Sequence, residues 1–272
     1  MPAVGSLHVV LRVQTTRGCL GLCIPPPAFT LYADGALVLR GPSEVTESPT
    51  GYFPFIRGGR LTITRLTRTE VSSLLQVALR MGGLATAERR YERAGRFSTE
   101  QVDIWIDGGA ISRHVSVRSS FEPGRLAPAS AQAIGRLLAL SDFLLGFRPG
   151  HDSSSATTAV LLPAEYLVTF SPTDDIGNGG GPTWPWPEVG LDRFRLWRLP
   201  DGTVRCGAVI TAEQHASLDP GATGGVVFTQ VHDPRDWVSY LTTRPLLPDE
   251  RLVRSADAPP FGRSCPPGMS AG

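Results

Sequence analysis

The chain has 272 residues, of which 41% are hydrophobic, and a formal net charge of +1. This length fits one large or two ordinary domains with a real core, and the near-neutral charge gives no reason to expect a nucleic-acid partner. No apolar run reaches the roughly 18 residues of a membrane-spanning helix, so we expect no transmembrane segment. Residues 1–5 lack the charged start and apolar run of a signal peptide, so we expect no leader in this chain.

The spacing of the four cysteines limits which disulfide, metal or redox sites the chain could form. Cys19 and Cys23 have three residues between them, and Gly21 lets the chain turn there. Prolines and a strand follow, whereas a thioredoxin-type motif has two intervening residues and then a helix. An even cysteine number is compatible with two disulfides. This pattern favours a structural disulfide, with reduced structural cysteines and metal or redox use as the open alternatives.

The first half of the chain is predicted to form strands, a helix, a hairpin and a second helix. Two hairpins are predicted around Asp-Gly turns, and a capping box at Thr67 and Glu70 opens the first helix. The charged segment 85–96 is predicted to be an exposed loop. The expected elements are strands at 7–13 and 60–66, hairpins at 28–41 and 101–118, and helices at 69–82 and 128–146. This order predicts an α+β fold with antiparallel sheets and helices packed on one face.

A polar, apolar-poor segment at 148–158 is the predicted boundary between two domains. We therefore expect an α+β domain over 1–148, a second, smaller α+β domain over 159–254, and a Pro/Gly-rich tail over 255–272. In the second half we expect a strand at 166–170 and a hairpin at 194–206. A further capping pair, Thr211 and Gln214, is expected to open a short helix.

Two motifs resemble known sequences. Arg17-x-Cys19-x-Gly21-x-Cys23 with the following Asp34-Gly35 hairpin resembles an uncharacterised bacterial domain family, over roughly residues 7–147. The segment Arg244-Pro-Leu-Leu-Pro-Asp-Glu250 is similar to secreted actinobacterial proteins of unknown function. Neither resemblance implies a reaction. Together they imply an extracytoplasmic location, secreted or at the cell surface, and the second supports pairing Cys206 with Cys265, beside Cys19 with Cys23.

No catalytic, cofactor-binding or metal-binding residue is predicted. None of the five histidines falls in a metal-ligand spacing, and the chain contains neither an HExxH nor a GxSxG motif. His114 in particular is predicted to be solvated. The glycine-rich loop near residues 174–181 lacks carboxylates where a calcium loop needs them, and it lacks the lysine of a nucleotide-binding loop.

Aromatic residues in predicted loops form the candidate interaction surface. They are Tyr52, Phe53, Phe55, Trp184 and Trp186. Their simpler interpretation is that they close the ends of the core. The sequence thus favours a non-catalytic exported protein with a binding or structural role and an unknown protein or glycan partner. The alternative is an enzyme, such as a hydrolase, that uses dispersed carboxylates such as Asp174, Asp175 or Glu188 in the second domain.

Overall fold

The computed structural model describes most of the chain, and it divides into two compact units. The described residues are 8–16, 26–42, 44–46, 55–57, 59–94, 101–120, 128–149, 158–172, 184–190, 193–198, 204–218, 227–232, 238–250 and 253–254. Unit 1 contains residues 1–41 and 61–161, and unit 2 contains residues 42–60 and 162–272. The mixture of antiparallel-rich sheets with few helices makes this an α+β protein, as predicted.

Unit 1 is built on an eight-stranded sheet in the order β10-β6-β3-β2-β1-β8-β9-β7. All neighbouring pairs are antiparallel except β7 with β9, which is parallel. Both predicted hairpins lie in this one sheet and are confirmed, as β2–β3 and β8–β9. The strands are β1 (Val9–Thr15), β2 (Phe29–Tyr32), β3 (Ala36–Arg40), β6 (Leu61–Arg65), β7 (Arg90–Ala94), β8 (Gln101–Asp107), β9 (Ser112–Ser120) and β10 (Ala159–Val160).

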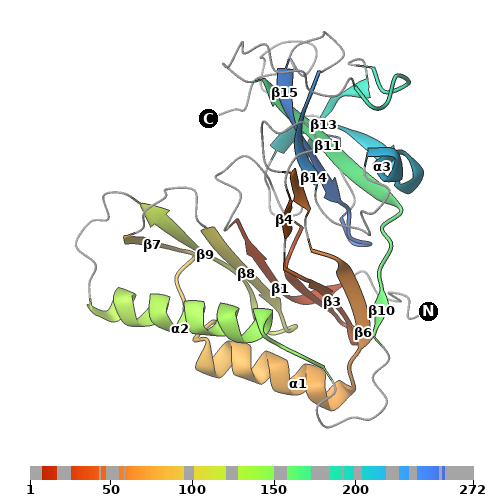
Figure 1. The fold of residues 1–272 in the computed structure, drawn as a ribbon. Helices are drawn as coiled ribbons and strands as arrows, with labels where there is room; N and C mark the ends of the chain where they lie inside the picture. Colours follow the sequence, from red (N-terminus) through yellow and green to blue (C-terminus); the bar gives the residue numbers. More distant parts are fainter. Residues whose placement is uncertain are drawn as a thin grey trace. The chain divides into compact units, whose positions relative to one another are not determined.

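Two helices cover one face of this sheet (Figure 1). They are α1 (Arg68–Gln76), which continues as the π-helical turn η1 (Val77–Met81), and α2 (Pro128–Leu145). The predicted capping box is present: Thr67 Oγ1 accepts from the Glu70 amide and the Glu70 carboxylate accepts from the Thr67 amide. Leucines and alanines of the helices pack against alternate residues of β1, β2, β8 and β9 in one core. Because strand residues alternate between faces, the remaining residues of those strands lie on the helix-free face.

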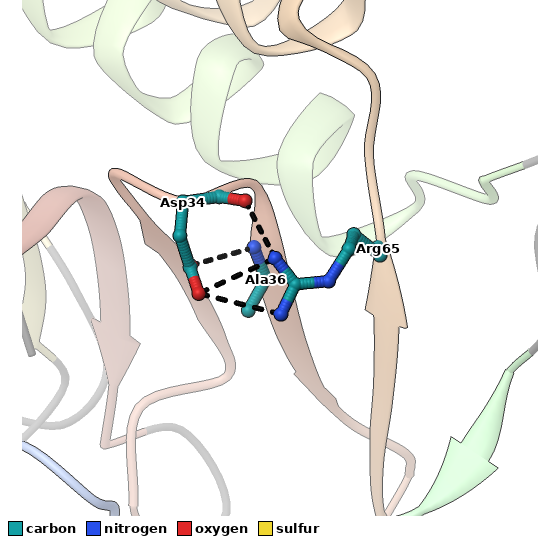
Figure 2. A network of polar contacts seen from close by, with 3 residues as sticks. All are labelled: Asp34, Ala36 and Arg65. Carbon is teal, nitrogen blue, oxygen red and sulfur yellow. Dashed lines mark hydrogen bonds and ion pairs between the residues drawn. The ribbon is translucent and has the colours of Figure 1, made fainter. Parts of the chain in front are cut away.

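The β2–β3 turn is held by an arginine from a more distant strand (Figure 2). Asp34 accepts a hydrogen bond from the amide of Ala36 at 3.1 Å, and Arg65 donates to both the Asp34 carbonyl and its carboxylate. Gly35 has φ +85°, and a Cβ there would lie 2.5 Å from the Leu66 carbonyl oxygen. Only glycine fits this turn without strain, which explains the Asp-Gly signal.

Unit 2 contains a second eight-stranded sheet, in the order β16-β12-β13-β11-β15-β14-β5-β4, and the paired strands are antiparallel. The helix α3 (Ala212–Leu218) follows β13, and the predicted Thr211–Gln214 cap is confirmed. The strands are β4 (Glu44–Thr46), β5 (Phe55–Arg57), β11 (Glu165–Pro172), β12 (Arg195–Arg198), β13 (Val204–Thr211), β14 (Val227–His232), β15 (Val238–Pro245) and β16 (Val253–Arg254).

The structure differs from the sequence analysis in two places. Residues 85–96 are not only loop, because Arg90–Ala94 forms β7; its partner β9 lies far along the chain, so the local sequence carries no sign of the pairing. The sequence is also not divided between the two units at a single boundary near residue 150. Residues 42–60 contribute β4 and β5 to unit 2, and β10 pairs with β6 in unit 1.

Candidate functional site: a polar strip on the helix-free face of unit 1

The two faces of strand β8 (Gln101–Asp107) carry different kinds of residue. Val102, Ile104 and Ile106 are buried in the core, as their alternation predicted. The other face carries Gln101, Asp103, Trp105 and Asp107, and the β8–β9 register places His114 opposite Trp105. We call the set Gln101, Asp103, Trp105, Asp107, His114 and His8 the polar strip.

The centre of the polar strip is a stack of two rings. The Trp105 and His114 rings lie 4.5 Å apart at an interplanar angle of 11°. His114 Nε2 lies 2.9 Å from Asp103 Oδ1, and Gln101 Nε2 donates to Asp103 Oδ2 at 2.5 Å. Asp103 is 6% exposed, whereas the His114 side chain is 42% exposed. A buried carboxylate thus fixes an exposed imidazole against a half-buried indole.

One end of the polar strip is a second imidazole–carboxylate pair. His8 Nε2 lies 3.0 Å from Asp107 Oδ2, and both side chains are about half exposed. The hydrogen bond from His8, and then that from the Gly109 amide, lower the pKa of Asp107 below its ordinary value. The carboxylate is therefore ionised at neutral pH and acts as the acceptor, so His8 carries its proton on Nε2.

The same face also carries buried polar residues near the strip. Arg12, Gln14, Thr30 and Ser116 are each at most 6% exposed, and Arg12 donates to Thr30 Oγ1 at 3.4 Å. Ser116 lies opposite Asp103 in the register, yet its hydroxyl has no hydrogen-bond partner. A serine nucleophile needs a hydrogen bond to its base. The Ser116, His114 and Asp103 side chains are therefore not arranged as a catalytic triad.

Of the tryptophans predicted to form an interaction surface, Trp186 lies in the core of unit 2 and Trp184 packs against that core, half-buried. Trp186 is 1% exposed and donates to the Gln214 carbonyl at 2.6 Å, while Trp184 donates to the Val189 carbonyl and meets the Trp186 ring edge-to-face. Pro187 and Pro185 interrupt regular structure, but the indoles still find carbonyl partners inside the unit. Trp186 is thus not available for a partner, which corrects that part of the prediction. Tyr52 and Phe53 lie outside the described residues, and Phe55 begins β5.

Of the carboxylates in the enzymatic alternative, only Glu188 lies among the described residues. Glu188 accepts from Gln214 Nε2 at 2.5 Å, and this hydrogen bond lowers the pKa of Glu188. A carboxyl that acts as a general acid at neutral pH needs a raised pKa instead. Asp174 and Asp175 lie outside the described residues. Within the part of the chain that the structure describes, no group of three or more His, Cys, Asp or Glu side chains could hold a metal ion.

The segment Arg244–Glu250 has a structural explanation. Arg244 donates to Glu250 Oε2 at 3.0 Å and to Oε1 at 2.6 Å, and the Leu247 amide also donates to Oε2 at 3.0 Å. Both side chains are at most 5% exposed. The arginine and glutamate therefore clamp the turn that follows β15, which accounts for their spacing in the sequence.

The predicted disulfides lie mostly beyond what the structure describes. Cys206 is a half-buried residue of β13 that packs against the core of unit 2. Cys19, Cys23 and Cys265 lie outside the described residues. Both pairings therefore stay predictions.

Sequence reasoning missed the polar strip, although a signal was present. The run Gln101 to Asp107 alternates polar or aromatic residues with aliphatic ones, and its turn fixes the register that brings Trp105 and His114 together. His114 was predicted to be solvated, and it is exposed, but it is also paired. The contact between His8 and Asp107 could not be predicted because 99 positions separate them.

Comparison with known proteins adds no family to this description. No protein-family model, curated protein or solved structure matches the chain. Among the described residues, no helix is long and apolar enough to cross a membrane.

Proposed function

We propose that this protein is an exported, non-catalytic binding protein whose ligand contacts the polar strip. The observation that carries the proposal is the Trp105–His114 stack, held in place by the buried Asp103 and partly open to solvent. A fixed aromatic pair offers contact area with little loss of side-chain entropy on binding. The exported location follows from the two sequence resemblances.

The chemistry of this face favours an uncharged, hydroxyl-rich ligand, so a glycan fits better than a charged peptide. Carboxylate, amide and imidazole groups beside an indole supply hydrogen bonds around an apolar platform. Among the described residues of β1, β7, β8 and β9, acidic and basic side chains are interspersed on this face: Asp103, Asp107, Glu92, Arg12, Arg90 and Arg118. Interspersed charges of both signs do not select a strongly charged partner.

Labelled full-length protein on a glycan array, with a peptide array beside it, tests this function. We expect glycan binding that Trp105→Ala weakens at least tenfold, as is usual when an interface aromatic is truncated. Phe143→Ala is the matched control, because Phe143 is also an exposed aromatic of unit 1 but lies on α2, in the helical layer. Binding that survives Trp105→Ala, or binding to peptides alone, would contradict the proposal.

The enzymatic alternative receives less support. A hydrolase with two carboxylates needs one of them to hold its proton near neutral pH. Glu188, the one candidate carboxylate among the described residues, has its pKa lowered instead of raised. Turnover of a glycan or ester substrate that Glu188→Gln abolishes would favour the enzyme over the binding protein.

A further inference from the structure

The polar strip contains two histidines, and each contacts an aspartate. His8 pairs with Asp107, and His114 pairs with Asp103. Histidine is the side chain whose ordinary pKa, about 6.5, lies closest to neutrality. Both imidazoles are exposed enough to exchange protons with solvent, with side-chain exposures of 55% for His8 and 42% for His114.

We propose that the polar strip is a pH-responsive surface that gains positive charge in mild acid. Among the described residues, the charged groups on the same face of the neighbouring strands are Asp103 and Asp107 from β8, Arg118 from β9, Arg90 and Glu92 from β7, and Arg12 from β1. Protonation of both imidazoles adds two positive charges to this set. Arg90 and Glu92 pair with each other at 2.7 Å, which leaves the histidines as the variable charges.

The protonated state is accommodated by contacts that already exist. A charged imidazole donates a stronger hydrogen bond to a carboxylate than a neutral one does, and each histidine already lies within hydrogen-bond distance of its aspartate. An imidazolium 4.5 Å from the Trp105 ring also gains from the electron-rich face of the indole. The surface therefore changes its charge without rearranging, and Asp107 stays ionised because its pKa lies below its ordinary value.

The consequence for ligands rests on the proposed function: an anionic group on a bound glycan would be bound more tightly in mild acid than at neutral pH. The change of charge itself is independent of any ligand. Its test is therefore made without one, so that failure of glycan binding and failure of this inference are distinguishable.

Ionic quenchers of tryptophan fluorescence measure the charge beside Trp105. The Trp105 signal is taken as the difference between wild type and Trp105→Phe, which removes the contribution of the other four tryptophans. Two added charges within about 10 Å raise the local concentration of an anion roughly two- to fivefold at low ionic strength. We expect the iodide quenching constant of Trp105 to rise by that factor between pH 8 and pH 5, and the caesium constant to fall.

Histidine variants separate the contributions of the two pairs. The double variant His8→Gln/His114→Gln is expected to show no pH dependence with either quencher, and each single variant is expected to show part of it. Glutamine keeps a hydrogen-bond donor for the aspartate, and far-UV circular dichroism confirms that each variant folds. Quenching of Trp105 that does not change with pH in wild type, or an unchanged response in the double variant, would overturn the inference.

Discussion

The buried Arg244–Glu250 clamp permits a sharp prediction about unit 2. Replacing Glu250 with alanine removes the acceptor of two guanidinium hydrogen bonds and of the Leu247 amide. Arg244 then stays buried, at 4% exposure, and it already has one nitrogen, Nε, without a partner. An arginine does not lose its proton in a protein, so it cannot escape the cost of burial by becoming neutral.

We expect Glu250→Ala to lower the free energy of unfolding by about 3–5 kcal/mol, the usual cost of breaking one side of a buried ion pair. Arg244→Ala leaves a buried carboxylate, which can take up a proton instead. Its cost is therefore expected to be smaller than that of Glu250→Ala.

Urea denaturation followed by tryptophan fluorescence measures these changes, since Trp184, Trp186 and Trp197 all lie in unit 2. The control is the Arg65–Asp34 pair of unit 1, whose unfolding Trp105 reports and whose side chains are 47% and 19% exposed (Figure 2). An exposed pair is worth about 0–1 kcal/mol, so Arg65→Ala is expected to have little effect. Equal, small losses for Glu250→Ala and Arg65→Ala would refute the reasoning, because burial would then not decide the cost.

Three further predictions concern packing, ionisation and cross-linking. A Cβ at Gly82 would lie 2.3 Å from a leucine side chain of α2 and 2.7 Å from a backbone carbonyl, so Gly82→Ala is expected to lower the free energy of unfolding by about 1–3 kcal/mol. At Gly135 on α2 a Cβ meets no atom within 4 Å, so Gly135→Ala is expected to raise the free energy of unfolding by about 0.5–1 kcal/mol in the same urea titration. Burial raises the pKa of Tyr166 to about 12, so its neutral form stabilises the fold below pH 10 and this contribution is lost as the pH rises toward 12. Tyr166→Phe is expected to make the free energy of unfolding fall less steeply between pH 10 and pH 12. An equally steep fall in the variant would contradict the raised pKa of Tyr166. Peptide mapping without reductant is expected to find Cys206 joined to Cys265, a bridge worth roughly 4 kcal/mol on the chain-entropy model, and two alkylatable thiols at these positions in exported protein would contradict it.

Local patterns in the sequence were sufficient for most of the elements. The Asp34-Gly35 turn, the Thr67–Glu70 cap and the alternation of Val102, Ile104 and Ile106 each depend on residues only a few positions apart. Such signals act within one turn or one strand, so the sequence alone predicted both hairpins, both unit 1 helices and the α+β class.

Contacts between distant parts of the chain decided the rest. The parallel partner of β7, the transfer of residues 42–60 to unit 2 and the pairing of His8 with Asp107 have no local signal. Burial is likewise a property of the assembled unit, and it placed Trp186 in the core while Trp105 stayed half-buried. An indole fits a core or a surface equally well, because its ring is apolar and its single donor needs only one carbonyl. Residue type and loop position alone therefore could not assign these tryptophans, and only the tertiary structure moved the candidate site from unit 2 to the polar strip.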